Sequence, residues 1–129
     1  MDKRELMIVA EKAKEMAYAP YSNFKVGAAL LAKDGVVFTG CNVENASYGA
    51  TCCAERVAIF KAVSDGYKDF EAIAISGGKK FTYPCGICRQ VLVEFNPDMR
   101  VIIGESNGEL KEYKASELLP EFFGPKELK

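Results

Sequence analysis

The sequence predicts a three-layer α/β/α sandwich around a mixed five-stranded sheet whose last two strands are antiparallel. Strand-like apolar runs alternate with segments of helical periodicity along the 129 residues. Two of these runs flank the turn signal at residues 33–35, and two flank Asn107 and Gly108, the strongest short hairpin signal in the chain. A chain of this length fits one domain with a single core, and we expect that domain to span residues 1–129.

The first expected element is an amphipathic helix over about residues 2–19, because apolar side chains recur there at helical spacing and Pro20 ends the pattern. A polar loop at residues 40–51 interrupts the later elements, and loops of this kind often carry binding sites. The expected strands are residues 24–32, 36–39, 72–76, 101–104 and 110–113. The expected helices are residues 53–63 and 88–95, with a short one from Ala115.

Composition excludes several functions. The chain has no histidine, so every site that needs imidazole as base or ligand is excluded. The 17 basic residues nearly balance the 18 acidic ones and are interspersed with them, which disfavours a nucleic-acid partner. No apolar run approaches the ~20 residues of a membrane span, and the charged start does not resemble a secretory signal. We therefore expect a cytoplasmic protein with no membrane partner.

The five cysteines carry the strongest chemical signal. Cys85 and Cys88 form a Cys-x-x-Cys pair, whose two thiolates can share one Zn²⁺. Without histidine, the third ligand must be another cysteine or a carboxylate, and Cys53 is the natural candidate. All three lie at or just before an expected helix start, where the helix dipole favours thiolates. Cys41 and Cys52 are interpreted as buried small apolar side chains.

Charged residues beside these cysteines indicate a hydrolytic site. Glu55 lies two residues after Cys53 and can move a proton between a metal-activated water and a substrate. Three thiolates leave a zinc site negatively charged, so we expect Arg56 to donate to the sulfurs, with Arg89 as a second candidate. The alternative is a purely structural zinc site, which would need Cys41 or Cys52 as its fourth ligand.

The pattern Cys53-Ala-Glu55 with Pro84-Cys85-x-x-Cys88 resembles the three-cysteine zinc deaminases of nucleosides. Residues 18–27, 40–48, 85–95 and 118–125 are similar to the small homotetrameric cytidine deaminases, so the resemblance covers nearly the whole chain. It implies one Zn²⁺ per subunit, and deamination of cytidine and deoxycytidine to uridine and deoxyuridine in pyrimidine salvage.

The resemblance also implies residue roles. Phe24 would contact the pyrimidine ring, Asn42 and Glu44 would bind the ribose hydroxyls, and Ala54 would contact the base through its backbone. Phe123 would reach into a neighbouring subunit's site within a homotetramer. Without the resemblance, Phe24 reads as a core residue, and Asn42 and Glu44 read equally well as loop-capping residues. Tyr48 and Tyr83 are interpreted as loop or surface residues.

Three alternative functions stay open at this point. One is deamination of another aminopyrimidine nucleoside, such as a blasticidin-type antibiotic, although Asn42 and Glu44 favour an ordinary ribose. The second is deamination of RNA or DNA, which the balanced charge and the predicted antiparallel last strand oppose. The third is a zinc-stabilised interaction module, which leaves Glu55 without a purpose.

Overall fold

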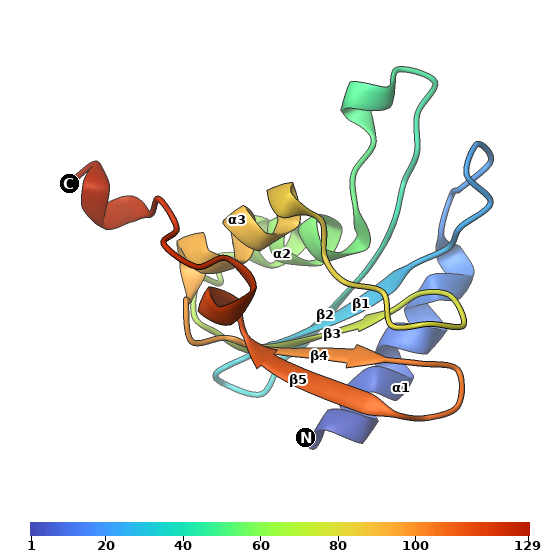
Figure 1. Cartoon of the computed structure of the whole chain (residues 1–129), viewed down its shortest axis with the longest axis horizontal. Helices are drawn as coiled ribbons and strands as arrows, with labels where there is room; N and C mark the ends of the chain where they lie inside the picture. Colours follow the sequence, from blue (N-terminus) through green and yellow to red (C-terminus); the bar gives the residue numbers. More distant parts are fainter.

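The computed structural model describes residues 1–129, which form one five-stranded sheet with helices on both faces (Figure 1). Helix α1 covers one face, and α2 and α3 cover the other, so the predicted three-layer sandwich is confirmed. The strand order is β2-β1-β3-β4-β5. The strands are β1 (Gly27–Ala32), β2 (Val37–Cys41), β3 (Phe70–Ser76), β4 (Arg100–Gly104) and β5 (Leu110–Lys114). The α-helices are α1 (Lys3–Ala13), α2 (Ala54–Ser64) and α3 (Gly86–Phe95).

Helix α1 begins as predicted and ends earlier than predicted. The Asp2 side chain accepts the Glu5 backbone N–H at 2.9 Å, and Glu5 accepts the Asp2 N–H at 3.2 Å, which is a capping box. A 3₁₀ turn (Lys14–Met16) follows Ala13. The backbone is then extended at residue 17, because Tyr18 pairs with Val43 of a distant loop. A tertiary contact thus overrides the helical pattern of residues 14–19.

The sheet is mixed, as predicted. Strands β3 and β4 are parallel, and α3 forms the crossover that such a connection requires. The pairs β1/β2, β1/β3 and β4/β5 are antiparallel. Both predicted hairpins are confirmed: Leu31 faces Val37 across the first turn, and Gly104 faces Leu110 across the second.

Close approach of helices to the sheet fixes the start of α2. All six residues of β1 are buried, because helices cover both faces of this central strand. A Cβ on Gly27 would lie 2.0 Å from the Ala10 carbonyl oxygen of α1. A Cβ on Gly40 would lie 2.3 Å from the Ala54 carbonyl oxygen. Glycine at position 40 therefore lets the first turn of α2 rest directly on β2.

Helix α2 is less completely buried than the sequence indicated. The prediction was a buried central helix, and five of its residues are buried, but Phe60 is 48% exposed. The short helix predicted from Ala115 is a 3₁₀ turn (Ala115–Leu118). Two further 3₁₀ turns, Tyr48–Ala50 and Pro125–Glu127, lie in loops. No helix has both the length and the apolar character needed to cross a membrane.

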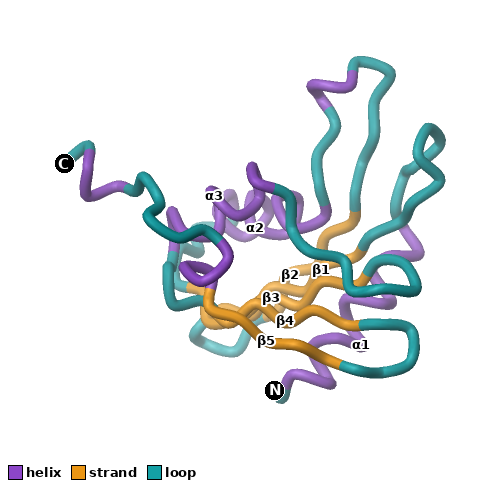
Figure 2. Tube along the Cα trace, in the orientation of Figure 1, coloured by secondary structure: helices purple, strands orange, loops and turns teal.

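Two long connections extend beyond the ends of β1 and β2 (Figure 2). One is the segment 17–26 between α1 and β1, and the other is the segment 42–52 between β2 and the start of α2; we call them the first and second paired loops. They are joined by backbone bonds: the Glu44 N–H donates to the Tyr18 carbonyl at 2.8 Å, and the Tyr18 N–H donates to the Asn42 carbonyl at 3.0 Å. The second loop leads directly into Cys53.

Candidate active site

Three cysteine sulfurs gather at the starts of two neighbouring helices. Cys53 is the N-cap of α2, Cys85 is the N-cap of α3, and Cys88 lies in the first turn of α3. Their sulfurs all lie within 4.8 Å of one another, and those of Cys53 and Cys85 are 3.8 Å apart. The five cysteines of the chain form no disulfide, and the sulfurs of Cys41 and Cys52 are not part of this group.

This geometry fits a zinc ion. Zinc binds thiolates at about 2.3 Å in a tetrahedral arrangement, which separates neighbouring sulfurs by about 3.8 Å. The distance of 3.8 Å between the Cys53 and Cys85 sulfurs equals that separation. A set of three thiolates also leaves one tetrahedral position open, as in zinc sites that act on a substrate. The residues present could therefore hold the ion that the sequence predicts.

The charges around the sulfurs favour a thiolate at Cys53. A hydrogen bond from Cys88, followed by donation from Arg56, lowers the pKa of Cys53 to about 5. Arg56 Nη2 donates to the Cys53 sulfur at 3.4 Å, and this bond raises the pKa of the guanidinium. Arg56 Nε is buried without a hydrogen-bond partner. The Nη2 bond places the positive charge of Arg56 beside the sulfurs, as expected from the sequence.

The same bonding raises the pKa of Cys88. Its thiol donates to Cys53, and its burial further disfavours a second negative charge. The hydrogen bond therefore favours the negative charge on Cys53 and the proton on Cys88. A divalent ion would remove that proton, because thiolates rather than thiols ligate metals.

Glu55 is a buried carboxyl beside the sulfurs. Glu55 lies in the first turn of α2 and is only 4% exposed. Burial disfavours the charged form and raises the pKa of Glu55 to about 7, with the negative charge of Cys53 adding to the rise. A carboxyl with this pKa can both accept and release a proton near neutral pH.

A cavity of about 260 Å³ joins this carboxyl to the two paired loops. Besides Cys53, Glu55 and Cys85, it is lined by four residues that the sequence analysis named: Phe24, Asn42, Glu44 and Ala54. It is also lined by Ser22, Val26, Thr51, Thr82 and Tyr83, to which the sequence analysis gave no role in binding. Residues from four separate segments therefore meet at one opening.

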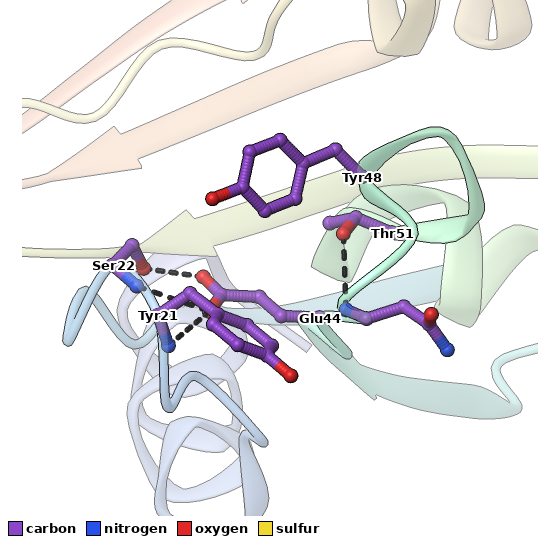
Figure 3. Close-up of a pocket in the computed structure, with 6 residues that line it drawn as sticks. Tyr21, Ser22, Glu44, Tyr48 and Thr51 are labelled. Carbon is purple, nitrogen blue, oxygen red and sulfur yellow. Dashed lines mark hydrogen bonds between the residues drawn. The ribbon is translucent and has the colours of Figure 1, made fainter.

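Asn42 and Glu44, in the second paired loop, hold the first paired loop in place. Asn42 Nδ2 donates to the Phe24 carbonyl, and Asn42 Oδ1 accepts the Val26 N–H, both at 2.8 Å. One carboxylate oxygen of Glu44, Oε1, accepts the N–H groups of Tyr21 at 3.0 Å and Ser22 at 3.1 Å (Figure 3). These two side chains keep Phe24 at the cavity, where it is 45% exposed.

Arg89 and Phe123 lie elsewhere. Arg89 Nε donates to the Pro84 carbonyl at 2.7 Å, and its Nη1 donates to the Leu118 carbonyl at 2.9 Å. It forms no hydrogen bond to a sulfur, so it braces the segment before Cys85 against the C-terminal tail. Phe123 is 57% exposed and lines none of the cavities of its own chain.

Comparisons with known proteins identify this arrangement. The family model of the cytidine and deoxycytidylate deaminase zinc-binding region matches residues 1–105. The cytidine deaminase of Sporosarcina psychrophila is 48% identical over 99% of this chain and 96% of that protein. The cytidine deaminase of Halalkalibacterium halodurans is 53% identical over 95% of each chain.

A solved structure agrees with these relatives. The crystal structure of cytidine deaminase from Burkholderia pseudomallei superposes with a TM-score of 0.92 at 50% identity, covering 95% of this chain and all of that one. The family model, the relatives and the fold all place the chain in one group. The chain therefore belongs to the family of zinc-dependent cytidine and deoxycytidylate deaminases.

Proposed function

We propose that this chain catalyses the hydrolytic deamination of cytidine and deoxycytidine to uridine and deoxyuridine, with release of ammonia. The observation that carries the proposal is the single cavity onto which a three-cysteine cluster and the buried Glu55 carboxyl both open. A structural zinc site would have no need of a buried carboxyl with a pKa of about 7 beside its ligands.

Cys53, Cys85 and Cys88 would hold the zinc ion. Bound there, zinc supplies the Lewis acidity that lets water act as a nucleophile near neutral pH. Arg56 offsets part of the charge of the three thiolates through its hydrogen bond to Cys53. These residues thus fix the end of the cavity at which C4 of the pyrimidine must lie.

Glu55 moves the protons of the reaction. Its carboxylate accepts a proton from the attacking water as the oxygen adds to C4 of the base, and it delivers that proton to N3. A second proton, from the new hydroxyl group at C4, passes to the amino group, which leaves as ammonia when the C4–N bond breaks. Cytidine and one water are thereby converted to uridine and ammonia.

The remaining residues bind the nucleoside. The exposed ring of Phe24 packs against the pyrimidine, and the backbone of Ala54 contacts the base beside Glu55. Asn42 and Glu44 bind the ribose hydroxyls. Each retains unused hydrogen-bonding capacity after holding the first paired loop, because an amide and a carboxylate each offer about four positions.

Phe123 completes the site of a neighbouring subunit in a homotetramer. Its exposed ring supports this, as does the anchoring of its backbone carbonyl by Gln90 Nε2 at 2.7 Å. Native mass measurement should give four chains, and Phe123→Ala should raise the KM for cytidine while the zinc content stays unchanged. A stable, fully active monomer would contradict this role.

A cytoplasmic place in pyrimidine salvage follows from the reaction.

The proposed function is tested by product analysis. Purified protein incubated with cytidine should form uridine and ammonia in equal amounts, and deoxycytidine should give deoxyuridine. Removal of zinc with a chelator should stop the reaction, and added zinc should restore it. Full turnover after complete zinc removal, or no turnover with one zinc per chain, would refute the proposal.

Blasticidin-type nucleosides are the second candidate substrates. A blasticidin-S deaminase of Bacillus cereus is 34% identical over 90% of this chain, less than the 48% and 53% identity of the two cytidine deaminases named above. Competition between cytidine and blasticidin S in one assay separates the two functions. We expect a kcat/KM for cytidine that exceeds the value for the antibiotic, and the reverse order would favour the second function.

A further inference from the structure

Ser22 bridges Glu44 and Phe24, two residues that line the cavity. Its hydroxyl donates to Glu44 Oε2 and accepts the backbone N–H of Phe24 at 3.0 Å. A serine hydroxyl has one proton to donate, and here that proton is committed to Glu44. Asn23, between the two partners of this turn, has a left-handed φ of 57°, which brings the Phe24 amide back toward Ser22.

Hydrogen bonding leaves Glu44 with one free position. Oε1 accepts two backbone N–H groups, from Tyr21 and Ser22, which occupy both of its lone pairs. Oε2 accepts the Ser22 hydroxyl and keeps one lone pair (Figure 3). The donation from Ser22 is also the main reason that the pKa of Glu44 is lowered. A substrate hydroxyl that binds Glu44 must therefore donate to Oε2, beside Ser22.

We propose that Ser22 is a positioning residue that turns the Glu44 carboxylate so that the free lone pair of Oε2 faces the sugar of the nucleoside. Ser22 thereby sets the affinity for the ribose hydroxyls and takes no part in the chemistry at C4. The inference rests on the proposed function. It is carried by the Glu44–Ser22–Phe24 hydrogen bonds and by the cavity that all three residues line.

The opposing interpretation is that Ser22 only closes a loop. A loop-closing serine would affect every substrate equally, because its loss would displace Phe24 and hence the base. A serine that acts through Glu44 should affect only substrates with ribose hydroxyls. The two interpretations therefore differ in their dependence on the sugar.

The test compares cytidine with 2′,3′-dideoxycytidine, which lacks both ribose hydroxyls near Glu44. Ser22→Ala should raise the KM for cytidine about five- to tenfold and leave kcat within about twofold. The size of the KM effect is that of one charge-assisted hydrogen bond, reduced because the bond is exposed to solvent. The kinetics of Ser22→Ala with the dideoxy substrate should match those of the wild type. Ser22→Thr, which restores a hydroxyl, should recover most of the affinity for cytidine.

Ser64→Ala is the matched control. Ser64 is the last residue of α2, far along the helix from Cys53, and its hydroxyl bonds only to the Lys61 carbonyl at 2.9 Å. Three results for Ser22→Ala would overturn the inference: equal losses with both substrates, a fall in kcat alone, or no change. Wild-type turnover of cytidine would still support the proposed function in each case. Absence of wild-type turnover would refute the proposed function, and this inference with it.

Discussion

The cysteine cluster and the two paired loops meet at one cavity but are built in different ways. The cysteines sit at the starts of α2 and α3, two helices packed on the sheet, and Cys88 is fully buried. The loops lie beyond the strands and are joined by side-chain bonds from Asn42, Glu44 and Ser22. The metal-binding half is thus complete within one chain, whereas Phe24 and Tyr48 of the other half stay exposed, Tyr48 at 77%.

This difference separates two kinds of effect. Changes in the cysteine half should alter zinc content and kcat, because they act on the metal and on proton transfer. Changes in the loop half should alter KM and leave zinc in place, because none of the hydrogen bonds of Ser22, Asn42 or Glu44 involves a sulfur. Zinc content and KM, measured together, therefore report separately on the two halves.

The largest effect is expected at Cys88. Cys88→Ser should lose zinc and reduce turnover to background, since only two of the three cysteine ligands remain and serine is a poor zinc ligand. Zinc analysis and cytidine assays on the same sample measure this. Cys52→Ser is the control, because its sulfur lies outside the cluster, and it should keep one zinc per chain. Zinc retained in Cys88→Ser would break the assignment of the ligands.

A smaller effect is expected at Arg56. Arg56→Ala removes the donor to the Cys53 sulfur, so zinc affinity should fall about 10- to 100-fold, as for other residues that support metal ligands. Competition with a chelator of known affinity measures the change. Arg89→Ala should leave zinc affinity unchanged, because Arg89 bonds only to backbone carbonyls. Equal losses in both variants would indicate a general charge effect.

A modest effect is expected at Gly78, on the loop side. A Cβ at this position would lie 2.9 Å from Cε1 of Phe24 and would displace that ring. Because the ring is exposed and can move, Gly78→Ala should raise the KM for cytidine only about two- to fivefold, with zinc content unchanged. Gly49→Ala, which meets nothing within 4 Å, is the control. An unchanged KM in Gly78→Ala would remove Phe24 from the proposed binding residues.

The smallest effect concerns pH and Glu44. The Ser22 hydroxyl lowers the pKa of Glu44. The contacts of the Glu44 carboxylate are therefore fully present above the ordinary pKa of a glutamate side chain, and they are lost only as pH falls through the lowered pKa. From pH 8 to 5.5, the ratio of inhibition constants for uridine and 2′,3′-dideoxyuridine should change less than about twofold. A large change near pH 6.5 would show that another group controls sugar binding.

The sequence predicted the cysteine half better than the loop half. Cys53, Cys85 and Cys88 converge because each lies at a helix start, and helix starts can be located from periodicity. The two hairpins followed from turn signals and strand patterns, whereas the order of the strands in the sheet was not predicted. Residues 24–26 do not join β1 as expected, because the Asn42 side chain takes their backbone bonds.

The sequence did not indicate Ser22 as a cavity residue and indicated Tyr83 only as a loop or surface residue, for a physical reason. Both lie in loops, where side-chain direction depends on distant partners rather than on a repeating pattern. Ser22 is oriented by Glu44, 22 residues away, and the Tyr83 hydroxyl is bonded to that of Tyr113 at 2.9 Å. The polar residues of the second loop were the only sequence signal for this part of the cavity. They indicated a binding site but not the residues of other loops that contact them.

The most direct test of the central claim is the Glu55→Gln variant, with zinc and turnover measured on one sample. Glutamine keeps the size of the side chain but cannot carry the proton, so we expect one zinc per chain and a kcat lower by about 10²- to 10⁴-fold. Undiminished turnover with zinc in place would contradict the role of Glu55 as the proton carrier of a hydrolytic zinc site.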